Sequence, residues 1–159
     1  MGTKAKQIVE VNLNELLKDL NKAFADEWLA YYQYWLGAKL ARGTAAPLVA
    51  KELEEHAAEE LDHATKLADR ILVLGGTPLL HPSEWFEQTS CGYSSPKNPD
   101  VIALLKQNIK GEQCAIAIYN KLLKKLKDKD EVTYHLILNI LEDEITHEDD
   151  LQKLLEDLE

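Results

Sequence analysis

The stretch APLVAKELEEHAAEELDHATKLADRILVL, residues 46–74, decides the fold. Its apolar residues recur every three or four positions, which is the spacing of one buried helix face. The middle of that face is polar, because Glu60 and His63 occupy it and His56 lies one turn earlier. A helix of this kind buries charged groups against its partner helices, and those partners must compensate them.

Three further segments have the same periodicity and nearly the same length. We expect helices at about 12–42, 46–74, 99–127 and 130–158, joined in the middle by a long crossover, residues 75–98, that contains one short helix at 83–88. Asn12 and Asn98 are the predicted N-terminal caps, and Gly43 is the predicted stop of the first helix. The short links form two antiparallel hairpins, and the crossover is long enough to span the bundle. The sequence therefore predicts one all-α domain, residues 1–159, with an up-down four-helix bundle.

The composition excludes several classes of protein. The 159 residues are 45% hydrophobic and 29% charged, as in one globular domain, and the formal net charge of −10 leaves no basic face for nucleic acid. No apolar run reaches the roughly 18 residues of a membrane span. Residues 1–6 lead into no signal-type apolar core. We therefore expect a cytoplasmic protein that binds neither nucleic acid nor membrane.

Each predicted helix carries a glutamate near the middle of its apolar face. Helices of equal length that run antiparallel share the level of their midpoints, so the four carboxylates should converge. Buried carboxylates that converge repel one another unless protons or cations lie among them. The four residues are Glu27, Glu60, Glu112 and Glu144.

Two of these glutamates begin a Glu-x-x-His motif. Glu60 precedes His63 and Glu144 precedes His147, a spacing that places acid and imidazole on one helix face. A single such motif is common on a solvated helix, but here each follows another mid-face glutamate, by 33 residues in one hairpin and 32 in the other. Four carboxylates and two imidazoles are the ligand set of di-iron and di-manganese bundle proteins. Oxygen-rich ligands favour Fe(II) or Mn(II) over structural zinc.

The motifs resemble those of bacterioferritins. EWLAYYQY at 27–34 is similar to their first helix, ELDH at 60–63 to their second, and DEITH at 143–147 to their fourth. The resemblance implies a ferritin-like four-helix bundle in which Glu60 and Glu144 bridge two iron ions. It also implies that Tyr34 lies beside the site. The remaining implied ligands are the terminal Glu27 and Glu112, with His63 and His147 taking one ion each.

Two departures narrow the resemblance. Bacterioferritins carry a haem-ligating methionine directly after the bridging glutamate of the second helix, where this chain has Leu61, and Met1 is its only methionine. We therefore expect no haem. The sequence also ends with the fourth predicted helix, without the short fifth helix of larger ferritin cages, as in the smaller Dps-type cages.

The cysteines are similar to those of the Dps-like thioferritins. Cys91 lies in the crossover, and Cys114 lies two residues after Glu112. The resemblance implies a redox-active pair near a di-iron site, in a shell of twelve subunits. From the residues alone, Cys114 lies about 200° around the helix from Glu112 and should not ligate the same metals. It can face the crossover and Cys91, or both cysteines can be small buried hydrophobic residues.

We expect an iron-oxidising mini-ferritin. It would bind two Fe(II) per subunit, with manganese as a possible metal, and oxidise iron with hydrogen peroxide or oxygen. It would store ferric mineral in a homo-oligomer and protect against oxidative stress. One alternative is a rubrerythrin-type peroxidase or oxidase that stores no iron, although the chain has no CxxC pair. The other is a Dps-type DNA-protecting protein, for which only Lys4 and Lys6 decorate the N-terminus.

An acidic run accompanies the buried face of the second predicted helix. It is either a solvated face or the lining of an inner cavity that gathers Fe(II). The run consists of Glu52, Glu55, Glu59 and Asp62.

Overall fold

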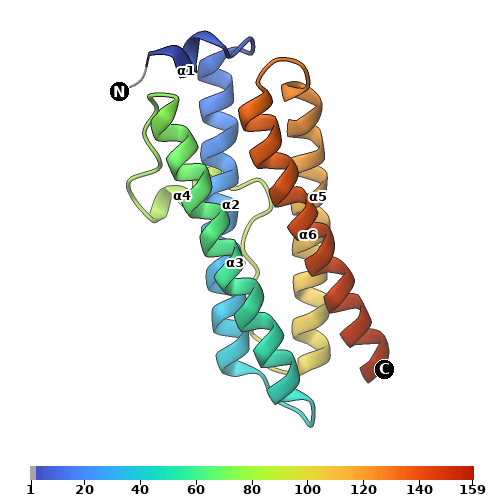
Figure 1. Ribbon diagram of the computed structural model, residues 1–159. Coiled ribbons are helices and arrows are strands. Elements are labelled where there is room, and N and C mark those ends of the chain that lie inside the picture. Colours follow the sequence, from blue (N-terminus) through green and yellow to red (C-terminus); the bar gives the residue numbers. More distant parts are fainter. Residues whose placement is uncertain (1–2) are drawn as a thin grey trace.

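The computed structural model describes residues 3–159, and Met1 and Gly2 lie outside the described residues. Four long helices lie side by side as two hairpins, and a crossover connects the hairpins along the bundle (Figure 1). This confirms the predicted all-α four-helix bundle. A short first helix, α1 (Lys4–Gln7), was not predicted. The others are α2 (Leu13–Leu40), α3 (Ala46–Val73), α4 (Ser83–Gln88), α5 (Val101–Leu126) and α6 (Glu131–Leu158).

Two predicted helix ends need correction. The side chain of Asn12 accepts a hydrogen bond from the Glu15 N–H at 3.1 Å, as its capping position predicts. By contrast, Asp100 and not Asn98 caps α5, because its carboxylate accepts from two backbone N–H groups of the first turn, at 3.1 and 3.3 Å. The first long helix ends at Leu40, before Gly43. The backbone of Arg42 instead pairs with the residues on either side of Asp100, which stops the helix.

The apolar core is divided into two clusters. One contains Leu20, Leu67 and Ile137, and the other contains Leu53 and Leu104, all fully buried. The mid-face polar residues of the four long helices lie between the clusters. They are therefore shielded from water at both ends. Within residues 3–159, no helix is long and apolar enough to cross a membrane.

A buried ion pair fixes the start of α6. The guanidinium of Arg70, near the end of α3, donates to both carboxylate oxygens of Asp130 at 3.0 and 3.1 Å and to the Thr133 hydroxyl at 2.7 Å. Asp130 also caps α6 by accepting from the Thr133 N–H at 3.0 Å. Because Arg70 and Asp130 are both buried, this contact joins the two hairpins at one end of the bundle.

The crossover packs against α2. Trp85 of α4 stacks on Trp28 with ring centroids 5.0 Å apart. The crossover residues that precede α4 are held by Asn21 of α2. The side chain of Asn21 accepts a hydrogen bond from the Leu79 N–H at 3.0 Å and donates one to the Thr77 carbonyl at 3.2 Å. These contacts hold the crossover beside the middle of the bundle.

Candidate metal centre

The structure brings all six predicted ligand residues together in the polar layer. Their ligand atoms form two groups, each within 4.8 Å, and Glu60 and Glu144 belong to both. Glu27 and His63 complete one group. The groups therefore have the shape of two adjacent metal positions with two shared carboxylates. The residues, each no more than 3% exposed, are Glu27, Glu60, His63, Glu112, Glu144 and His147.

The two imidazoles present the same nitrogen to the carboxylates. Nδ1 of His63 lies 3.2 Å from Glu144 and 3.3 Å from Glu27, and Nδ1 of His147 lies 3.3 Å from Glu60. Neither Nδ1 has a hydrogen-bond partner among the described residues, and one oxygen of Glu27, of Glu60 and of Glu144 is equally unpartnered. Buried polar atoms are normally satisfied. Their convergence fits cations among them, which would satisfy all of these atoms at once.

The protonation of the cluster shows how it avoids repulsion without cations. Burial, and then the charges of Glu60 and Glu144, raise the pKa of Glu27 well above its usual range; burial and Glu144 do the same to the pKa of Glu112. For His147, burial opposes protonation, but the nearby carboxylates of Glu144 and Glu60 raise its pKa to about 12. The cluster therefore retains protons, which bound divalent cations would displace.

Two further carboxylates orient the imidazoles from behind. Nε2 of His63 lies 3.0 Å from Asp143 of α6, and Nε2 of His147 lies 2.5 Å from Glu59 of α3. Each histidine is thus held by an acid from the opposite hairpin, which directs Nδ1 towards the cation positions. Neither acid was predicted from the sequence to hold a histidine. The available signal was that each one directly precedes the glutamate of a Glu-x-x-His motif.

Two tyrosines hold the outer carboxylates in the same crossed manner. Tyr34 of α2 donates to Glu112 of α5, and Tyr119 of α5 donates to Glu27 of α2. Burial, and then the nearby carboxylates, raise the pKa of both phenols well above the usual range, so both keep their protons. Tyr34 was expected beside the site and Tyr119 was not. Each tyrosine follows a mid-face glutamate by seven residues, a repeat that could have revealed the second.

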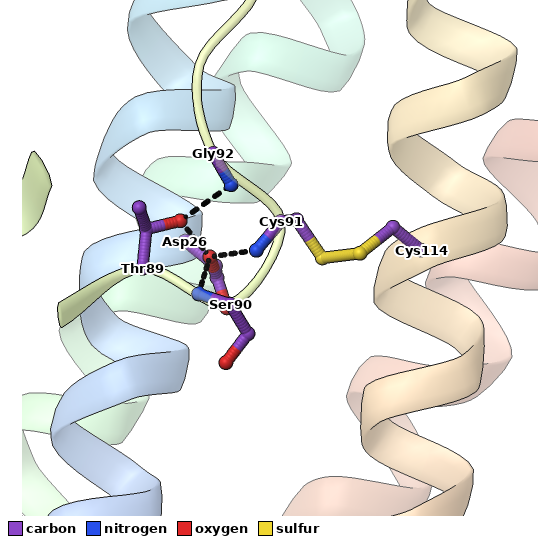
Figure 2. The surroundings of a disulfide bond; sticks show 6 residues. All are labelled: Asp26, Thr89, Ser90, Cys91, Gly92 and Cys114. Carbon is purple, nitrogen blue, oxygen red and sulfur yellow. Dashed lines mark hydrogen bonds between the residues drawn. A yellow bond between two sulfur atoms is a disulfide. The ribbon is translucent and has the colours of Figure 1, made fainter.

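The two cysteines form a disulfide between the crossover and α5 (Figure 2). Asp26 fixes the loop that carries Cys91, because one of its oxygens accepts hydrogen bonds from the Thr89 hydroxyl and from the N–H groups of Ser90 and Cys91. Of the two possibilities left by the residues, the structure has Cys114 facing the crossover. The cysteines are not metal ligands in either group.

A cavity connects the disulfide with the metal centre. It has a volume of about 380 Å³ and is lined by Cys91 and Gln33, by Lys110 of α5, and by ligand carboxylates that include Glu27 and Glu112. A small molecule in this cavity can therefore contact both the disulfide region and the carboxylates.

The family follows from a comparison with protein-family models. The model described as a ferritin-like domain matches residues 17–159, which include all six clustered residues. The chain belongs to the ferritin-like family.

This ferritin-like protein has relatives of more than one kind. It superimposes on a bacterioferritin-related protein from Bacteroides fragilis, described as a dodecameric thioferritin, with a TM-score of 0.96, 42% identity and coverage of 99% of this chain and 95% of the other. It is 32% identical to a DNA protection during starvation protein from Pyrococcus furiosus, over 91% of this chain and 79% of that protein. It is 33% identical to a bacterioferritin from Brucella melitensis, over 89% of this chain and 83% of that protein.

We predict that the acids behind the histidines control cation affinity in this ferritin-like protein. In Asp143→Asn the amide can donate to Nε2 of His63, which would leave Nδ1 protonated and unable to bind a cation. We expect an affinity for Co²⁺ about 10–100-fold lower, as for other partners of metal-bound histidines. An anaerobic Co²⁺ titration measures it. Asp149→Asn, at an exposed acid of the same helix α6, is the matched control, and an equal affinity in both variants would contradict the prediction.

Proposed function

We propose that this protein binds two Fe(II) ions per subunit as substrates, oxidises them and retains the product in an oligomeric shell. The observation that carries the proposal is the pair of overlapping ligand groups that share Glu60 and Glu144. A shared pair of carboxylates holds two ions close to each other, so that both can give an electron to one oxidant molecule.

The charges and stoichiometry support this assignment. Four carboxylates carry four negative charges when deprotonated, which balance two divalent ions. Each Fe(II) gives up one electron, so two ions together reduce one hydrogen peroxide, with two protons, to two molecules of water. The two electrons pass to one oxidant in the same site, and a one-electron route to hydroxyl radical is thereby avoided. Oxygen is the alternative oxidant, and Mn(II) is an alternative metal for the same oxygen-rich ligands.

The chain's own residues position these reactants. Tyr34 and Tyr119 hold the outer carboxylates, and Asp143 and Glu59 hold the imidazoles. The ligands are thereby fixed before the ions arrive, which lowers the cost of organising the site when they bind. The cavity beside Cys91 gives a small oxidant access to the carboxylates from the side of the crossover.

A shell of twelve subunits is part of the proposal. The Bacteroides relative described as dodecameric is 42% identical over nearly the whole of both chains. In such a shell the acidic run of α3 would line the interior and collect Fe(II). Exposed apolar residues such as Leu48, Leu72 and Ile145 offer surface for subunit contacts.

The test combines size and iron loading. Apoprotein receives Fe(II) without oxygen, followed by one hydrogen peroxide per two Fe(II), and the ferric absorbance is then followed through size-exclusion chromatography. We expect ferric iron to elute with a species of about twelve subunits. Rapid oxidation by a dimer that releases its iron would favour a rubrerythrin-type enzyme. Slow oxidation, no faster than in buffer, would refute the proposal.

We propose that the cysteine pair takes part in peroxide reduction. When reduced, two thiols can give two electrons to one hydrogen peroxide and form the disulfide and two waters. After treatment with a reductant, we expect Cys91→Ser/Cys114→Ser to consume peroxide more slowly than wild type. We also expect the variant to be about 3 kcal/mol less stable than the disulfide-bonded wild type, because the loop between the two positions is no longer closed. Ser95→Ala, in the same crossover, is the control. Peroxide consumption equal to that of the control would refute a redox role.

The name of the Pyrococcus relative makes DNA binding a second candidate. The net charge of −10 opposes it, since affinity for DNA depends on cationic contacts with phosphate. We expect no shift of linear DNA in a gel assay at low salt. A shift that is lost at high salt would support this second function.

A further inference from the structure

We propose that Glu52, His56 and Asp150 form a third divalent-cation site, separate from the two positions of the metal centre. One ligand atom from each of the three residues lies within 4.8 Å of the others. Glu52 and His56 lie one turn apart on α3, and Asp150 comes from α6. None of the three belongs to the two groups that share Glu60 and Glu144.

The imidazole of His56 is the observation that points to a ligand. The residue is only 3% exposed, and its Nδ1 has no hydrogen-bond partner among the described residues. Its Nε2 faces Glu52 Oε1 at 3.3 Å. The ring is fixed on its other sides, because it stacks on His147 with centroids 4.1 Å apart and meets Tyr34 edge-on at 5.3 Å. A buried, rigid imidazole that faces a carboxylate is a preorganised ligand.

Neither Glu52 nor Asp150 forms a close ion pair with a lysine or an arginine among the described residues. Asp150 lies 3.7 Å from the amino group of Lys153, which binds Asp149 more closely. Among residues 3–159, Glu52 has no ion pair with a lysine or an arginine. Two acids and a neutral imidazole would balance one divalent ion. The side chain of Glu52 is 24% exposed and that of Asp150 is 39% exposed, so an ion from solvent can reach both carboxylates.

This arrangement breaks the symmetry of the metal centre. When α3 and α6 are aligned by pairing Glu60 with Glu144, the positions that correspond to Glu52 and His56 are Leu136 and Ile140. The position that corresponds to Asp150 is Lys66. The proposed site therefore has three side chains that can bind a cation, whereas the corresponding positions on the opposite side of the metal centre have two apolar residues and a lysine. The extra ligands are not a by-product of the repeated helix pattern.

The ligand types define the ion. One imidazole nitrogen with two carboxylates suits first-row transition ions such as Fe²⁺, Co²⁺ or Zn²⁺, whereas Ca²⁺ and Mg²⁺ prefer oxygen alone. Because His56 stacks on His147, an ion at this site would lie beside the metal centre and nearer the surface. The site would hold an incoming ion next to the ligands that receive it.

The test counts ions with a probe that does not undergo oxidation. Assembled apoprotein is titrated with Co²⁺ under argon, in excess Mg²⁺. Glu52→Gln/Asp150→Asn removes both carboxylates, while Glu54→Gln/Asp149→Asn removes the same charge from exposed neighbours on the same helices. We expect the first variant to bind one Co²⁺ per subunit fewer than wild type, and the control to match wild type. Equal stoichiometry in the two variants would overturn the proposal.

A crystal structure supplies an independent readout. Crystals of the control variant soaked in Zn²⁺ should give an anomalous peak among Glu52, His56 and Asp150, and crystals of Glu52→Gln/Asp150→Asn should not. A peak absent from both would overturn the proposal. Neither measurement depends on iron oxidation. The third site can therefore be refuted while the proposed function stands, and the proposed function can be refuted while the third site stands.

Discussion

Glu60→Ala should abolish rapid Fe(II) oxidation. Glu60 is the one residue of α3 whose carboxylate belongs to both ligand groups, so its loss affects both cation positions. Removing a partner that only orients a metal-bound histidine already costs about 10–100-fold in affinity or activity. We therefore expect removal of the shared ligand to lower the rate of Fe(II) oxidation by more than about 100-fold.

The measurement is the initial rate of ferric absorbance after peroxide is added to Fe(II)-loaded protein. Glu54→Ala is the matched control, because Glu54 is an exposed acid of the same helix that pairs with Lys39. Circular dichroism and size-exclusion chromatography establish that both variants fold and assemble. A Glu60→Ala protein that folds, assembles and oxidises Fe(II) as fast as the control would remove the metal centre from the mechanism.

Arg70→Met should cause a large loss of stability although it lies outside the metal centre. Asp130 is only 2% exposed, and the change removes the guanidinium that pairs with it. The same guanidinium also donates to the Thr133 hydroxyl. Breaking a buried ion pair from one side typically costs about 3–5 kcal/mol, because the remaining charge stays buried without compensation. We expect a loss of that size in the free energy of unfolding.

Denaturant unfolding followed by circular dichroism, at one protein concentration for all variants, measures this loss. Lys66→Met, at an exposed position of the same helix, should change stability by less than about 0.5 kcal/mol. Arg70→Met/Asp130→Asn should recover part of the loss, since the amide oxygen can still cap α6 and no buried charge remains. A double variant no more stable than Arg70→Met would show that the cost does not come from an unpaired Asp130.

Helix ends were harder to predict than helices. Asn98 and Asp100 both have capping side chains, and the sequence does not rank them. The choice depends on the Arg42 backbone, which pairs with the residues beside Asp100. The same contact ends α2 before Gly43. Contacts between two loops that lie far apart in the chain thus decide where the helices start and stop.

The clustered residues were accessible to sequence reasoning because their arrangement is local. Glu60 and His63 share a helix face by their spacing alone, and so do Glu144 and His147. The mid-helix positions of Glu27 and Glu112 then place them at the same level. Their role as metal ligands stays a prediction that the Glu60 experiment tests.

Other features depended on contacts between helices. Tyr119 donates to Glu27, Asp143 holds His63, and Cys91 reaches Cys114 only because of how each helix is rotated and how deeply the crossover packs. The sequence alone determined the four amphipathic helices and the polar layer of each, since both follow from spacing within one helix. The tertiary structure decided which acid holds which histidine and which tyrosine holds which carboxylate. Those pairings depend on the relative rotation of two helices, which no spacing within a single helix specifies.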